Sequence, residues 1–582
     1  MNQVINRFTW KIGGAAGDGI MVTGAMLSKI FTRAGLWVTD YSEYPSLIRG
    51  GHNTQVVQVD EEQIFTHDQG NEILVALNEE TVRLHASEIS PGGVIIYDDA
   101  RLKILPAMIG NREDIDLMAV PFQKIASDLG GKDIMRNTVA LGASLAFLDA
   151  PFNLIEGVMQ DTFGDKGEKI VKLNINIARA GYDFVKSNFK KTFPWLIKPK
   201  KQETHMVISG NEAMALGLLQ GGLKFYAAYP MTPASSILIT LAELAPVYGH
   251  VTKHAEDEIA AVNLAIGAAF AGVRSATGTS GGGFCLMTEG LGLAAETETP
   301  LVIVNAQRPG PSTGLPTWTE QGDLRFVMHA SQGDFPRVIS APADPTQAFY
   351  ESVRALNIAE KFHMQVIMLT DKYLAESHWT TPEFDLTKAK IEQGGFLENP
   401  PKGQVFYQRY ADSPNGVTPR SLPGQPGGVF TANSDEHSPL GYSTESSEDR
   451  ELQVEKRAKK LEAVKAFLGE TVVKEGPENS DVTFVTWGSA TQSCREALRK
   501  LKVMGVNANI LQILYILPFP ADAVSRVLKN SKKTILVENN FSGQLGGVIR
   551  EFTGLKCDAE LLKYDGRPFW PEEIVDFVKK VI

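Results

Sequence analysis

The chain has 582 residues, of which 43 % are hydrophobic and 21 % are charged. This composition is typical of globular proteins, and the length is sufficient for about three or four domains. The net charge of −11 argues against a nucleic-acid-binding surface as the main function, because neutralising phosphates requires clustered Lys and Arg.

The N-terminal stretch MNQVINRFTWKIGGAAGDG has no charged segment followed by an apolar core, so we expect no secretory signal. No run reaches about 18 apolar residues, so we expect no transmembrane helix. Cys285, Cys494 and Cys557 lie far apart without a CxxC pair, which excludes a disulfide framework and indicates a reducing, cytoplasmic compartment. Three cysteines also cannot supply the four ligands of an iron–sulfur cluster.

Residues 1–190 alternate strand-like and helix-like patterns. The expected elements are strands over 8–14, 36–42, 73–77 and 92–99, and helices over 19–35 and 137–149. This alternation predicts a Rossmann-like domain with a mainly parallel sheet. The basic, Pro-containing stretch 186–205 follows as a predicted linker.

Residues 205–385 repeat this alternation and predict a second α/β domain. Its expected strands cover residues 205–210, 225–230, 250–254, 273–279, 301–307 and 365–371. Residues 386–479 combine a turn-rich stretch with a charged helix over 448–469, and 480–582 predict a last α/β unit.

The glycine-rich motif GGAAGDGIMVTG, residues 13–24, follows a strand and opens a helix, and Asp40 follows about twenty residues later. This is the context of a dinucleotide-binding turn, in which backbone amides at a helix N-terminus favour an anion. Gly14, Gly17 and Gly19 are however spaced G-x-x-G-x-G, not G-x-G-x-x-G. Nicotinamide binding and a purely structural turn therefore both remain open.

Two further features of this region concern anionic ligands. The triplet Gly17-Asp18-Gly19 resembles the start of a magnesium–diphosphate site of thiamine enzymes, but residues 42–49 lack the asparagine that such a site needs, so we reject that interpretation. The stretch YPSLIRGGHN places Arg49 beside two glycines, which is either a polar turn or a place where backbone and guanidinium can approach an anion.

Polar residues follow four expected strands of the second domain. Thr232 follows the strand over 225–230 and fits a helix N-cap with Pro233 at the first helical position. The acids 256–258 follow the strand over 250–254, and TSGGG and Arg308 follow the next two strands. Because the carboxyl ends of parallel strands meet at one edge of a sheet, we expect a ligand site there.

The chemistry of that edge suits an acidic ligand. Arg308, on a Pro- and Gly-rich turn, can hold a carboxylate bidentately, although a surface ion pair is the alternative. Thr317 can add a hydroxyl donor. The acids Glu256, Asp257 and Glu258 open an Ala- and Gly-rich helix, where acids often act only as partners of the helix dipole.

Four of these motifs, YPMTPASS, EDEIAAVNLAIGAAFAG, TGTSGGGFCLMTEGLG and VNAQRPGPSTGLPT, resemble the α subunit of 2-oxoacid:ferredoxin oxidoreductases. NSDEHSPLG, VENNFSGQLGG and KYDGRPF look like the same chain, and GGAAGDG and YPSLIRGGHN look like the γ domain of the family, fused ahead of α. The resemblance covers nearly the whole chain. The layout is similar to that of 2-oxoglutarate enzymes and their broad-specificity relatives.

The resemblance implies three α/β domains with mainly parallel sheets. They are a γ domain (1–190), a pyrimidine-binding thiamine diphosphate domain (205–385) and, after a linker with a charged helix (386–479), a transketolase C-terminal-like domain (480–582). In the family the last domain serves mainly structure and assembly, so we assign it no catalytic residue. His437, in the SDEH loop, is expected to be structural.

The implied activity is the oxidative decarboxylation of a 2-oxoacid, with 2-oxoglutarate and succinyl-CoA as the expected pair, or the reductive carboxylation in reverse. Thiamine diphosphate is shared with a β subunit that carries Mg²⁺, the diphosphate site and a [4Fe–4S] cluster, in an αβ or (αβ)2 assembly. Coenzyme A accepts the acyl group and ferredoxin accepts the electrons. The alternatives are a pyruvate or broad-specificity enzyme, an NAD-dependent oxidoreductase and a non-catalytic assembly subunit.

The resemblance also implies roles for individual residues. The catalytic residues are Glu258, Arg308 and Thr232, and Glu258 binds the aminopyrimidine of the cofactor. The remaining assignments are cofactor contacts at Tyr229, Pro230, Gly281 and Gly282, substrate contacts at Thr232, Arg308 and Thr317, and a closing or coenzyme A contact at Ser46 and Arg49. No metal ligand is expected on this chain.

Overall fold

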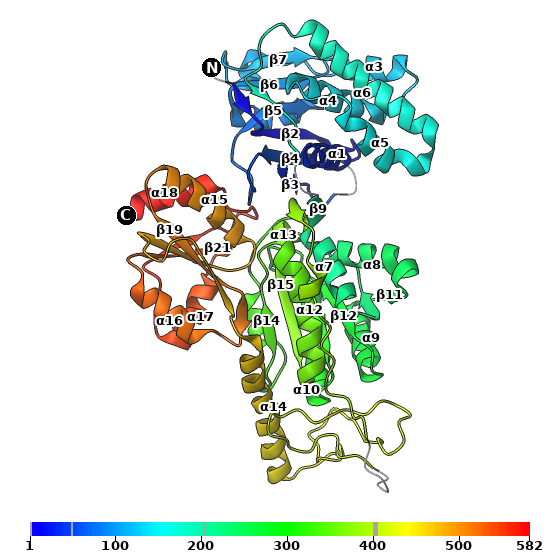
Figure 1. The fold of residues 1–582 in the computed structure, drawn as a ribbon, viewed down its shortest axis with the longest axis vertical. Helices are drawn as coiled ribbons and strands as arrows, with labels where there is room; N and C mark the ends of the chain where they lie inside the picture. The colour runs from blue at the N-terminus through cyan, green and yellow to red at the C-terminus, as the bar shows by residue number, and fades with distance from the viewer. Residues whose placement is uncertain (1–2, 48–49, 202–204, 400–405) are drawn as a thin grey trace. The chain divides into compact units, whose positions relative to one another are not determined.

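The computed structural model describes residues 3–47, 50–201, 205–399 and 406–582 (Figure 1). The chain forms two compact units, each of which is described by itself. Unit 1 comprises Met1–Ile208, Ser377–Glu383 and Trp570–Glu573. Unit 2 comprises Ser209–Glu376, Phe384–Phe569 and Ile574–Ile582.

Unit 1 contains an eight-stranded sheet of order β7-β6-β5-β2-β4-β3-β16-β9. The strands are β2 (Phe8–Ala15), β3 (Trp37–Glu43), β4 (His52–Asp60), β5 (Asn71–Ala76), β6 (Ile89–Tyr97), β7 (Asp116–Ala119), β9 (His205–Ser209) and β16 (His378–Pro382). β2, β5, β6 and β7 are parallel, but β4 is antiparallel to β2 and β3. The short connection between β3 and β4 leaves no room for a crossover helix, so this sheet is mixed where the sequence predicted mainly parallel pairing.

Helices cover this sheet and bury most of its apolar side chains. They are α1 (Ile20–Arg33), α2 (Glu79–His85), α3 (Phe122–Asp128), α4 (Arg136–Phe147), α5 (Leu154–Phe163) and α6 (Glu168–Asn188), and a small pair joins β1 (Val4–Ile5) to β8 (Trp195–Leu196). Gly142 of α4 and Gly181 of α6 let the two helices pack closely, because a Cβ at either position would meet the backbone of the other helix. The Gly-rich turn predicted before α1 is present, with Gly19 at φ 74°.

The first sheet of unit 2 has seven strands in the order β11-β10-β12-β13-β15-β14-β20. These are β10 (Phe225–Ala228), β11 (Val251–His254), β12 (Ser275–Thr279), β13 (Leu301–Gln307), β14 (Val338–Ser340), β15 (Gln365–Asp371) and β20 (Tyr515–Leu517). All neighbours except β14 and β20 are parallel. The carboxyl ends of β11, β10, β12 and β13 therefore share one edge, as the sequence predicted.

Seven helices of the described part of unit 2 precede, connect or follow the strands of this sheet. They are α7 (Gly210–Gln220), α8 (Ser235–Tyr248), α9 (Glu258–Phe270), α10 (Gly281–Glu296), α11 (Leu324–His329), α12 (Pro345–Phe362) and α13 (Lys372–Glu376) (Figure 1). Strands such as β13 are buried along their whole length, which is typical of parallel strands covered on both faces.

The C-terminal part of unit 2 forms a five-stranded sheet of order β17-β19-β18-β21-β22. Its elements are β17 (Val472–Glu475), β18 (Val482–Thr486), α15 (Ala490–Val503), β19 (Ala508–Ile513), α16 (Ala521–Asn530), β21 (Thr534–Glu538), α17 (Gln544–Thr553), β22 (Ala559–Leu562) and α18 (Pro571–Val581). One hydrophobic core spans both sheets of unit 2. The mainly parallel α/β architecture expected for the chain is thus confirmed.

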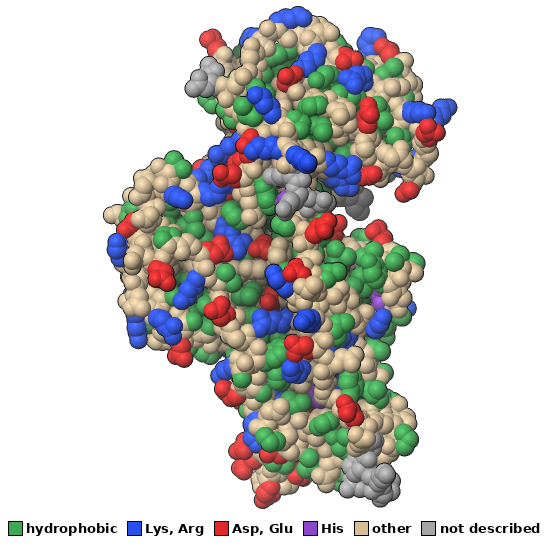
Figure 2. All heavy atoms as spheres, viewed as in Figure 1, with side chains coloured by type: hydrophobic (Ala, Val, Ile, Leu, Met, Phe, Trp, Pro, Cys, Tyr) green, Lys and Arg blue, Asp and Glu red, His purple; other side chains and the backbone are tan. Residues whose placement is uncertain are grey.

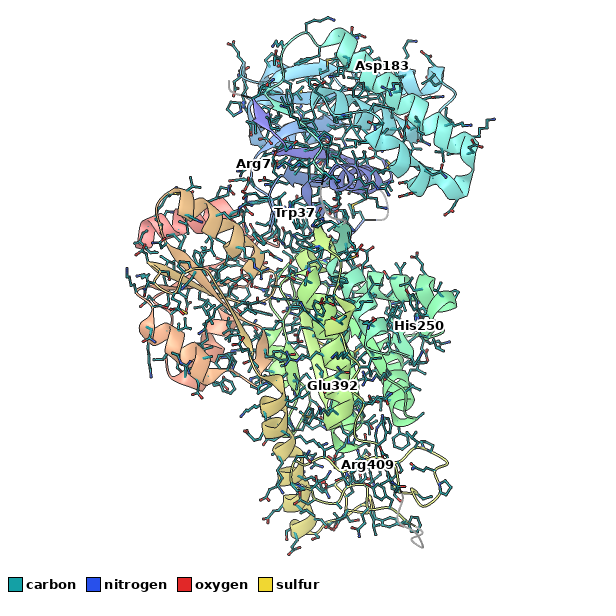
Figure 3. The ribbon with its side chains drawn as sticks, viewed as in Figure 1. Arg7, Trp37, Asp183, His250, Glu392 and Arg409 are labelled. Atoms are coloured by element: carbon teal, nitrogen blue, oxygen red, sulfur yellow. The ribbon has the colours of Figure 1, made fainter. Side chains whose placement is uncertain are left out.

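The turn-rich stretch before α14 (Ser447–Leu468) is packed, and the charged helix predicted there is confirmed. Arg409, labelled in Figure 3, extends from this stretch and is buried together with Glu298, Lys456 and Lys460. Lys460 Nζ donates to Glu298 Oε2 at 2.5 Å, Lys456 Nζ donates to Oε1, and Arg409 Nη1 lies 3.7 Å from Oε2. A single carboxylate therefore joins α14 and the loop to the end of α10.

Within the described ranges, no helix combines the length and the apolar character that crossing a bilayer requires.

Candidate active site

The three acids before α9 have different environments. Asp257 is the N-cap of the helix, and its Oδ1 accepts a hydrogen bond from the Ala260 N–H at 2.7 Å. Glu256 is exposed, whereas Glu258, the first residue of α9, is only 4 % exposed. Two of the acids therefore serve the helix terminus or the solvent, and the third is inside the protein.

The carboxylate of Glu258 lacks a partner for one of its oxygens. Oε1 is buried and accepts no hydrogen bond from any described residue. A Cβ at Gly283 would lie 2.5 Å from this oxygen, so glycine at this position keeps the space beside the carboxylate open. Because burying an unpaired acceptor is unfavourable, this geometry fits a ligand that supplies a hydrogen-bond donor, such as a protonated ring nitrogen.

Arg308 follows β13 and connects two of the strand ends. Its Nη1 donates to the carbonyl oxygen of Thr232 at 2.7 Å, which ties the loop after β10 to the loop after β13. Burial lowers the pKa of Arg308, while the negative charges of Asp323 and Glu258 oppose that shift. A guanidinium has five N–H donors, so one contact with a carbonyl leaves it suited to hold a carboxylate as well.

Two acids of this region were not identified from the sequence: Asp323, which acts electrostatically on Arg308, and Glu320, on which Asp323 acts. Asp323 accepts a hydrogen bond from Asn305 Nδ2 at 3.2 Å, and its own N–H donates to Gln307 Oε1 at 2.9 Å. Burial raises the pKa of Asp323 to about 6, and burial together with Asp323 raises that of Glu320 to about 7. The polar Asn305 and Gln307 in an otherwise apolar strand were the available signal for a polar site here.

The other expected residues of this edge lie as follows. Thr317 is buried, Tyr229 and Pro230 are exposed, and Gly281 opens α10 where a Cβ would collide with the Asp323 carboxylate. Gly282 is exposed at the same helix end.

The prediction that Thr232 caps α8 was wrong. The helix begins at Ser235 with Ala234 as its N-cap residue. A turn closed by the Ala234 N–H and the Met231 carbonyl, 2.8 Å apart, comes first, so the chain is not yet helical at Pro233. Thr232 contributes its carbonyl oxygen to Arg308 instead.

The polar loops of unit 1 have partners of their own. Asp18 of the glycine-rich turn accepts from the Ala15 N–H at 3.0 Å and pairs with Arg136. Asp40 accepts from Ser28 Oγ of α1 at 3.0 Å and from the His378 N–H of β16 at 3.1 Å, so its carboxylate already has two partners within unit 1. These contacts favour a structural turn over a dinucleotide site. Ser46 is exposed, and Arg49 lies outside the described residues.

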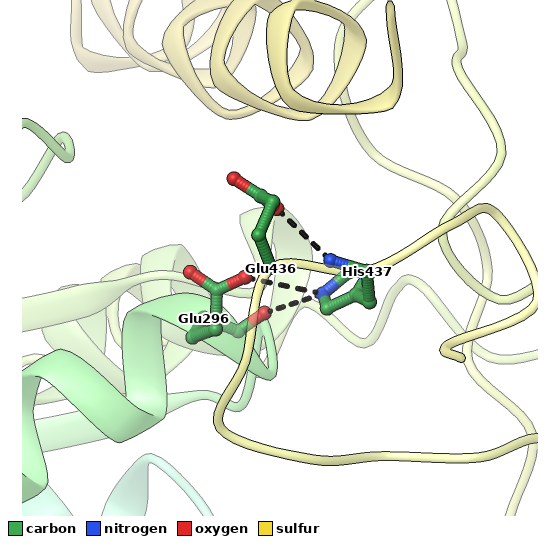
Figure 4. A group of neighbouring side chains, drawn as sticks. All are labelled: Glu296, Glu436 and His437. Atoms are coloured by element: carbon green, nitrogen blue, oxygen red, sulfur yellow. Dashed lines mark hydrogen bonds and ion pairs between the residues drawn. The ribbon is translucent and has the colours of Figure 1, made fainter. Parts of the chain in front are cut away.

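A second acidic cluster, formed by Glu296, Glu436 and His437, is shown in Figure 4. The ring nitrogens of His437 lie 3.1 Å from the Glu296 carbonyl oxygen and 3.2 Å from that of Ser438. Burial raises the pKa of Glu296 to about 7, whereas Arg457 and Arg450 hold that of Glu436 at about 2 against the effect of burial. Two arginines beside two carboxylates make this an ion-pair network, and its geometry supports the structural role expected for His437.

Comparisons with known proteins agree with this architecture. Three family models match consecutive ranges: "Pyruvate ferredoxin/flavodoxin oxidoreductase" over 9–184, "Pyruvate flavodoxin/ferredoxin oxidoreductase, thiamine diP-bdg" over 216–456, and "Pyruvate:ferredoxin oxidoreductase core domain II" over 480–574. The fold and the site thus define the class as a thiamine diphosphate-binding oxidoreductase component.

Similar proteins narrow the class. The α subunit of a 2-oxoacid:ferredoxin oxidoreductase from Sulfolobus sp is 33 % identical, and the match covers 99 % of this chain and 97 % of that protein. The 2-oxoglutarate synthase subunit KorA of Archaeoglobus fulgidus is 34 % identical over 64 % of this chain and 98 % of its own length. The solved 2-oxoglutarate:ferredoxin oxidoreductase of Magnetococcus marinus has a TM-score of 0.91 at 32 % identity, and the match covers 99 % of both chains. The chain therefore belongs to the α-subunit family of the 2-oxoacid:ferredoxin oxidoreductases, which confirms the resemblance.

Proposed function

We propose that this α subunit, with its β subunit, oxidatively decarboxylates 2-oxoglutarate, transfers the succinyl group to coenzyme A and passes the electrons to ferredoxin, or catalyses the reverse reductive carboxylation. The observation that carries the proposal is the buried, unpaired Oε1 of Glu258 at the edge that also holds Arg308. The solved Magnetococcus marinus enzyme, which matches over 99 % of this chain, has 2-oxoglutarate, coenzyme A and succinyl-CoA bound.

Thiamine diphosphate, when bound, supplies the carbanion chemistry that decarboxylation of a 2-oxoacid requires. Glu258 would hold the aminopyrimidine by sharing a proton between its Oε1 and a ring nitrogen, and the space that Gly283 leaves beside this oxygen supports that contact. Tyr229 and Pro230 after β10, and Gly281 and Gly282 at the start of α10, would line the ring on either side.

The 2-oxoacid would bind through its carboxylate to Arg308. Thr232 anchors this guanidinium through its carbonyl oxygen, and its hydroxyl and that of the buried Thr317 would donate to the keto acid. Ser46 and Arg49 of the γ domain are proposed to contact coenzyme A. Arg308, by neutralising the carboxylate before carbon dioxide leaves, would bind and orient the substrate.

The β subunit would dock at the outer edge of the sheet that begins with β11. Exposed apolar side chains gather there on α8, β11 and α9, and Figure 2 shows hydrophobic side chains over α8. They include Ile239, Val247, Tyr248, Val251, Ile259 and Leu264. An apolar patch of this kind marks a protein interface, and this one adjoins Glu258. The β subunit would complete the site with Mg²⁺, the diphosphate contacts and the [4Fe–4S] cluster, for which this chain has too few cysteines.

Anaerobic purification of the native complex tests the proposal. The chain that co-purifies is identified, and coenzyme A-dependent viologen reduction is measured with 2-oxoglutarate, pyruvate and branched 2-oxoacids. We expect the highest kcat/KM with 2-oxoglutarate. Similar kcat/KM values for several 2-oxoacids would instead indicate a broad-specificity enzyme, as the name of the Sulfolobus relative suggests. No reduction with any acid would defeat the assignment.

A further inference from the structure

The segment from Thr319 to Arg325, which contains Asp323, is held by the C-terminal part of unit 2. The Thr319 N–H donates to the Gly566 carbonyl at 3.0 Å. Farther along, Gln544 Nε2 donates to the Gly322 carbonyl at 2.6 Å, and Gln544 Oε1 accepts from the Arg325 N–H at 2.9 Å. Backbone groups of this segment are thus paired with a loop and with α17 of the C-terminal part of unit 2, whose sheet differs from the one that carries the active-site strands.

Gln321 is the centre of this attachment. It is fully buried, and its N–H and carbonyl pair with the Asn539 carbonyl at 2.7 Å and with Asn540 Nδ2 at 2.9 Å. Its side chain accepts from the Asn539 N–H at 2.9 Å and donates to the Trp487 carbonyl at 2.9 Å. Both its backbone groups and both its amide atoms are therefore bound to the C-terminal sheet, which fixes this residue tightly.

Asp323, two residues later, is bound to the other sheet of unit 2. Its N–H pairs with Gln307 and its carboxylate with Asn305, both on β13. Arg308 directly follows Gln307, so the hydrogen bond from the Asp323 N–H places the acid beside the loop that carries the guanidinium, and the two charges influence each other. The Asp323 carboxylate is nevertheless bonded to Asn305 and the guanidinium to the Thr232 carbonyl, and no ion pair within 4.0 Å joins Asp323 and Arg308 in the described part of the chain. The acid is therefore close enough to compete for the guanidinium but is held away from it.

We propose that Gln321, anchored by Asn539 and Asn540, keeps Asp323 out of ion-pair distance of Arg308, so that the guanidinium stays available to the carboxylate of the 2-oxoacid. Gln321 is thus a positioning residue, and the C-terminal sheet, to which the sequence analysis gave only a structural part, contributes to substrate binding. The inference rests on the proposed role of Arg308. If the anchor is removed, Asp323 can relax toward Arg308 and compete with the substrate, which raises KM more than it lowers kcat.

A second amide contact between the same two parts of unit 2 provides a matched control. Gln347 of α12 and Gln512 of β19 exchange hydrogen bonds of 3.0 and 2.8 Å between their side chains. This pair forms no hydrogen bond with residues 319–325 in the described structure. Gln512→Ala therefore removes a comparable buried contact without touching Asp323.

The test uses the assembled αβ enzyme and measures KM and kcat for the 2-oxoacid with the highest kcat/KM at saturating coenzyme A. We expect Gln321→Ala to raise KM about ten-fold while kcat stays within about two-fold, and Gln512→Ala to change neither. Adding Asp323→Asn to Gln321→Ala should return KM to the value of Asp323→Asn alone, because the neutral amide has no charge with which to form an ion pair with Arg308.

Asn540→Ala removes a single hydrogen bond from Gln321 and should also raise KM. This variant tests the inference if Gln321→Ala does not assemble with the β subunit. The inference is overturned if these variants match Gln512→Ala, or if Asp323→Asn fails to rescue KM. Arg308→Ala, measured in parallel, separates this outcome from failure of the proposed function. Wild-type KM in Arg308→Ala would overturn the role of Arg308 and the inference with it.

Discussion

At the scale of single residues, acids that look alike in the sequence have different environments in the structure. Glu258 is buried with one oxygen unpaired, while its neighbours Glu256 and Asp257 are exposed. Asp323 and Glu320 have raised pKa values because their carboxyl groups are partly withdrawn from solvent. Burial, and not residue type, therefore distinguishes the acids that can take part in the reaction from those that cannot.

The raised pKa values predict how substrate binding depends on pH. Arg308, Glu320 and Cys285 act electrostatically with Asp323. Above pH 7, Asp323 and Glu320 are both largely ionised, and the charge of Asp323, which acts directly on Arg308, opposes the substrate carboxylate there. As the pH falls from 8 to 6 these acids take up protons, so we expect KM for the 2-oxoacid to fall.

Steady-state kinetics of the complex between pH 6 and 8 check this prediction. Asp323→Asn should remove the part of the profile near pH 6, and Glu320→Gln the part near pH 7. A wild-type KM that does not change over this range, or a profile that Asp323→Asn leaves intact, would contradict it.

The sequence was informative about Glu258 and Arg308 but not about Asp323. Arg308 directly follows β13 and Glu258 lies four residues after β11, and the parallel order of the strands places both at one edge of the sheet. Asp323 is placed by a hydrogen bond that its carboxylate accepts from Asn305, by one that its N–H donates to Gln307, and by a segment fixed by a distant sheet. Such non-local contacts leave no periodic pattern in the sequence.

At the scale of secondary-structure elements, α14 is held by buried charge. Burial alone would raise the pKa of Glu298, but Lys460, Lys456 and Arg409 hold it well below its usual range. Burial lowers the pKa of Lys460 to about 7. Three cations share one carboxylate, so removing the carboxylate should destabilise the protein more than removing any one of the cations.

This imbalance predicts that one substitution destabilises the protein and a second does not. Glu298→Gln leaves Lys456, Lys460 and Arg409 buried without a counter-charge, so we expect a loss of about 3–5 kcal/mol in the free energy of unfolding. Lys460→Met leaves Glu298 with two cations and should preserve stability. Urea unfolding of the α chain, followed by circular dichroism, measures both, and a larger loss in Lys460→Met than in Glu298→Gln would contradict the account.

The pH dependence of unfolding gives a further check on Lys460. Its pKa is lowered from 10.5 to about 7, so between these values the native state binds fewer protons than the unfolded state. Stability contributed by this group therefore rises with pH over that window. We expect the rise in the urea midpoint from pH 7 to 9 to be smaller in Lys460→Met than in the wild type, and an equal rise in both would refute this.

At the scale of the whole molecule, the mainly parallel α/β architecture was predictable from the sequence, but the sheet that each strand joins was not. The predominantly hydrophobic pattern of residues 507–517 is typical of a single strand. The chain bends at Leu514, whose carbonyl accepts from the Ala341 N–H at 2.7 Å, and forms β19 in one sheet and β20 in another. β16 likewise pairs with β3, far away in the sequence. Local hydrophobic patterns determine that a strand forms, but not which sheet it joins.

The exposed apolar edge predicts where the partner subunit binds. Val251 of β11 is 55 % exposed at the edge of its sheet, and Val503 at the end of α15 is 90 % exposed. We expect Val251→Glu to reduce co-purification of the β subunit at least about ten-fold, because it places a charge in an apolar interface. The matched variant Val503→Glu should retain the partner. Undiminished co-purification of Val251→Glu would show that the interface lies elsewhere.

The central claim, that Glu258 is the acid serving the thiamine cofactor, is tested most directly by Glu258→Gln beside Glu256→Gln in the assembled complex. The measurement is 2-oxoacid- and coenzyme A-dependent viologen reduction, with assembly verified by size-exclusion chromatography. We predict that Glu258→Gln lowers kcat by about 10²- to 10⁴-fold, because the amide cannot share a proton with the cofactor, whereas Glu256→Gln stays within about two-fold of wild type. A fully assembled Glu258→Gln enzyme with wild-type kcat would contradict the assignment.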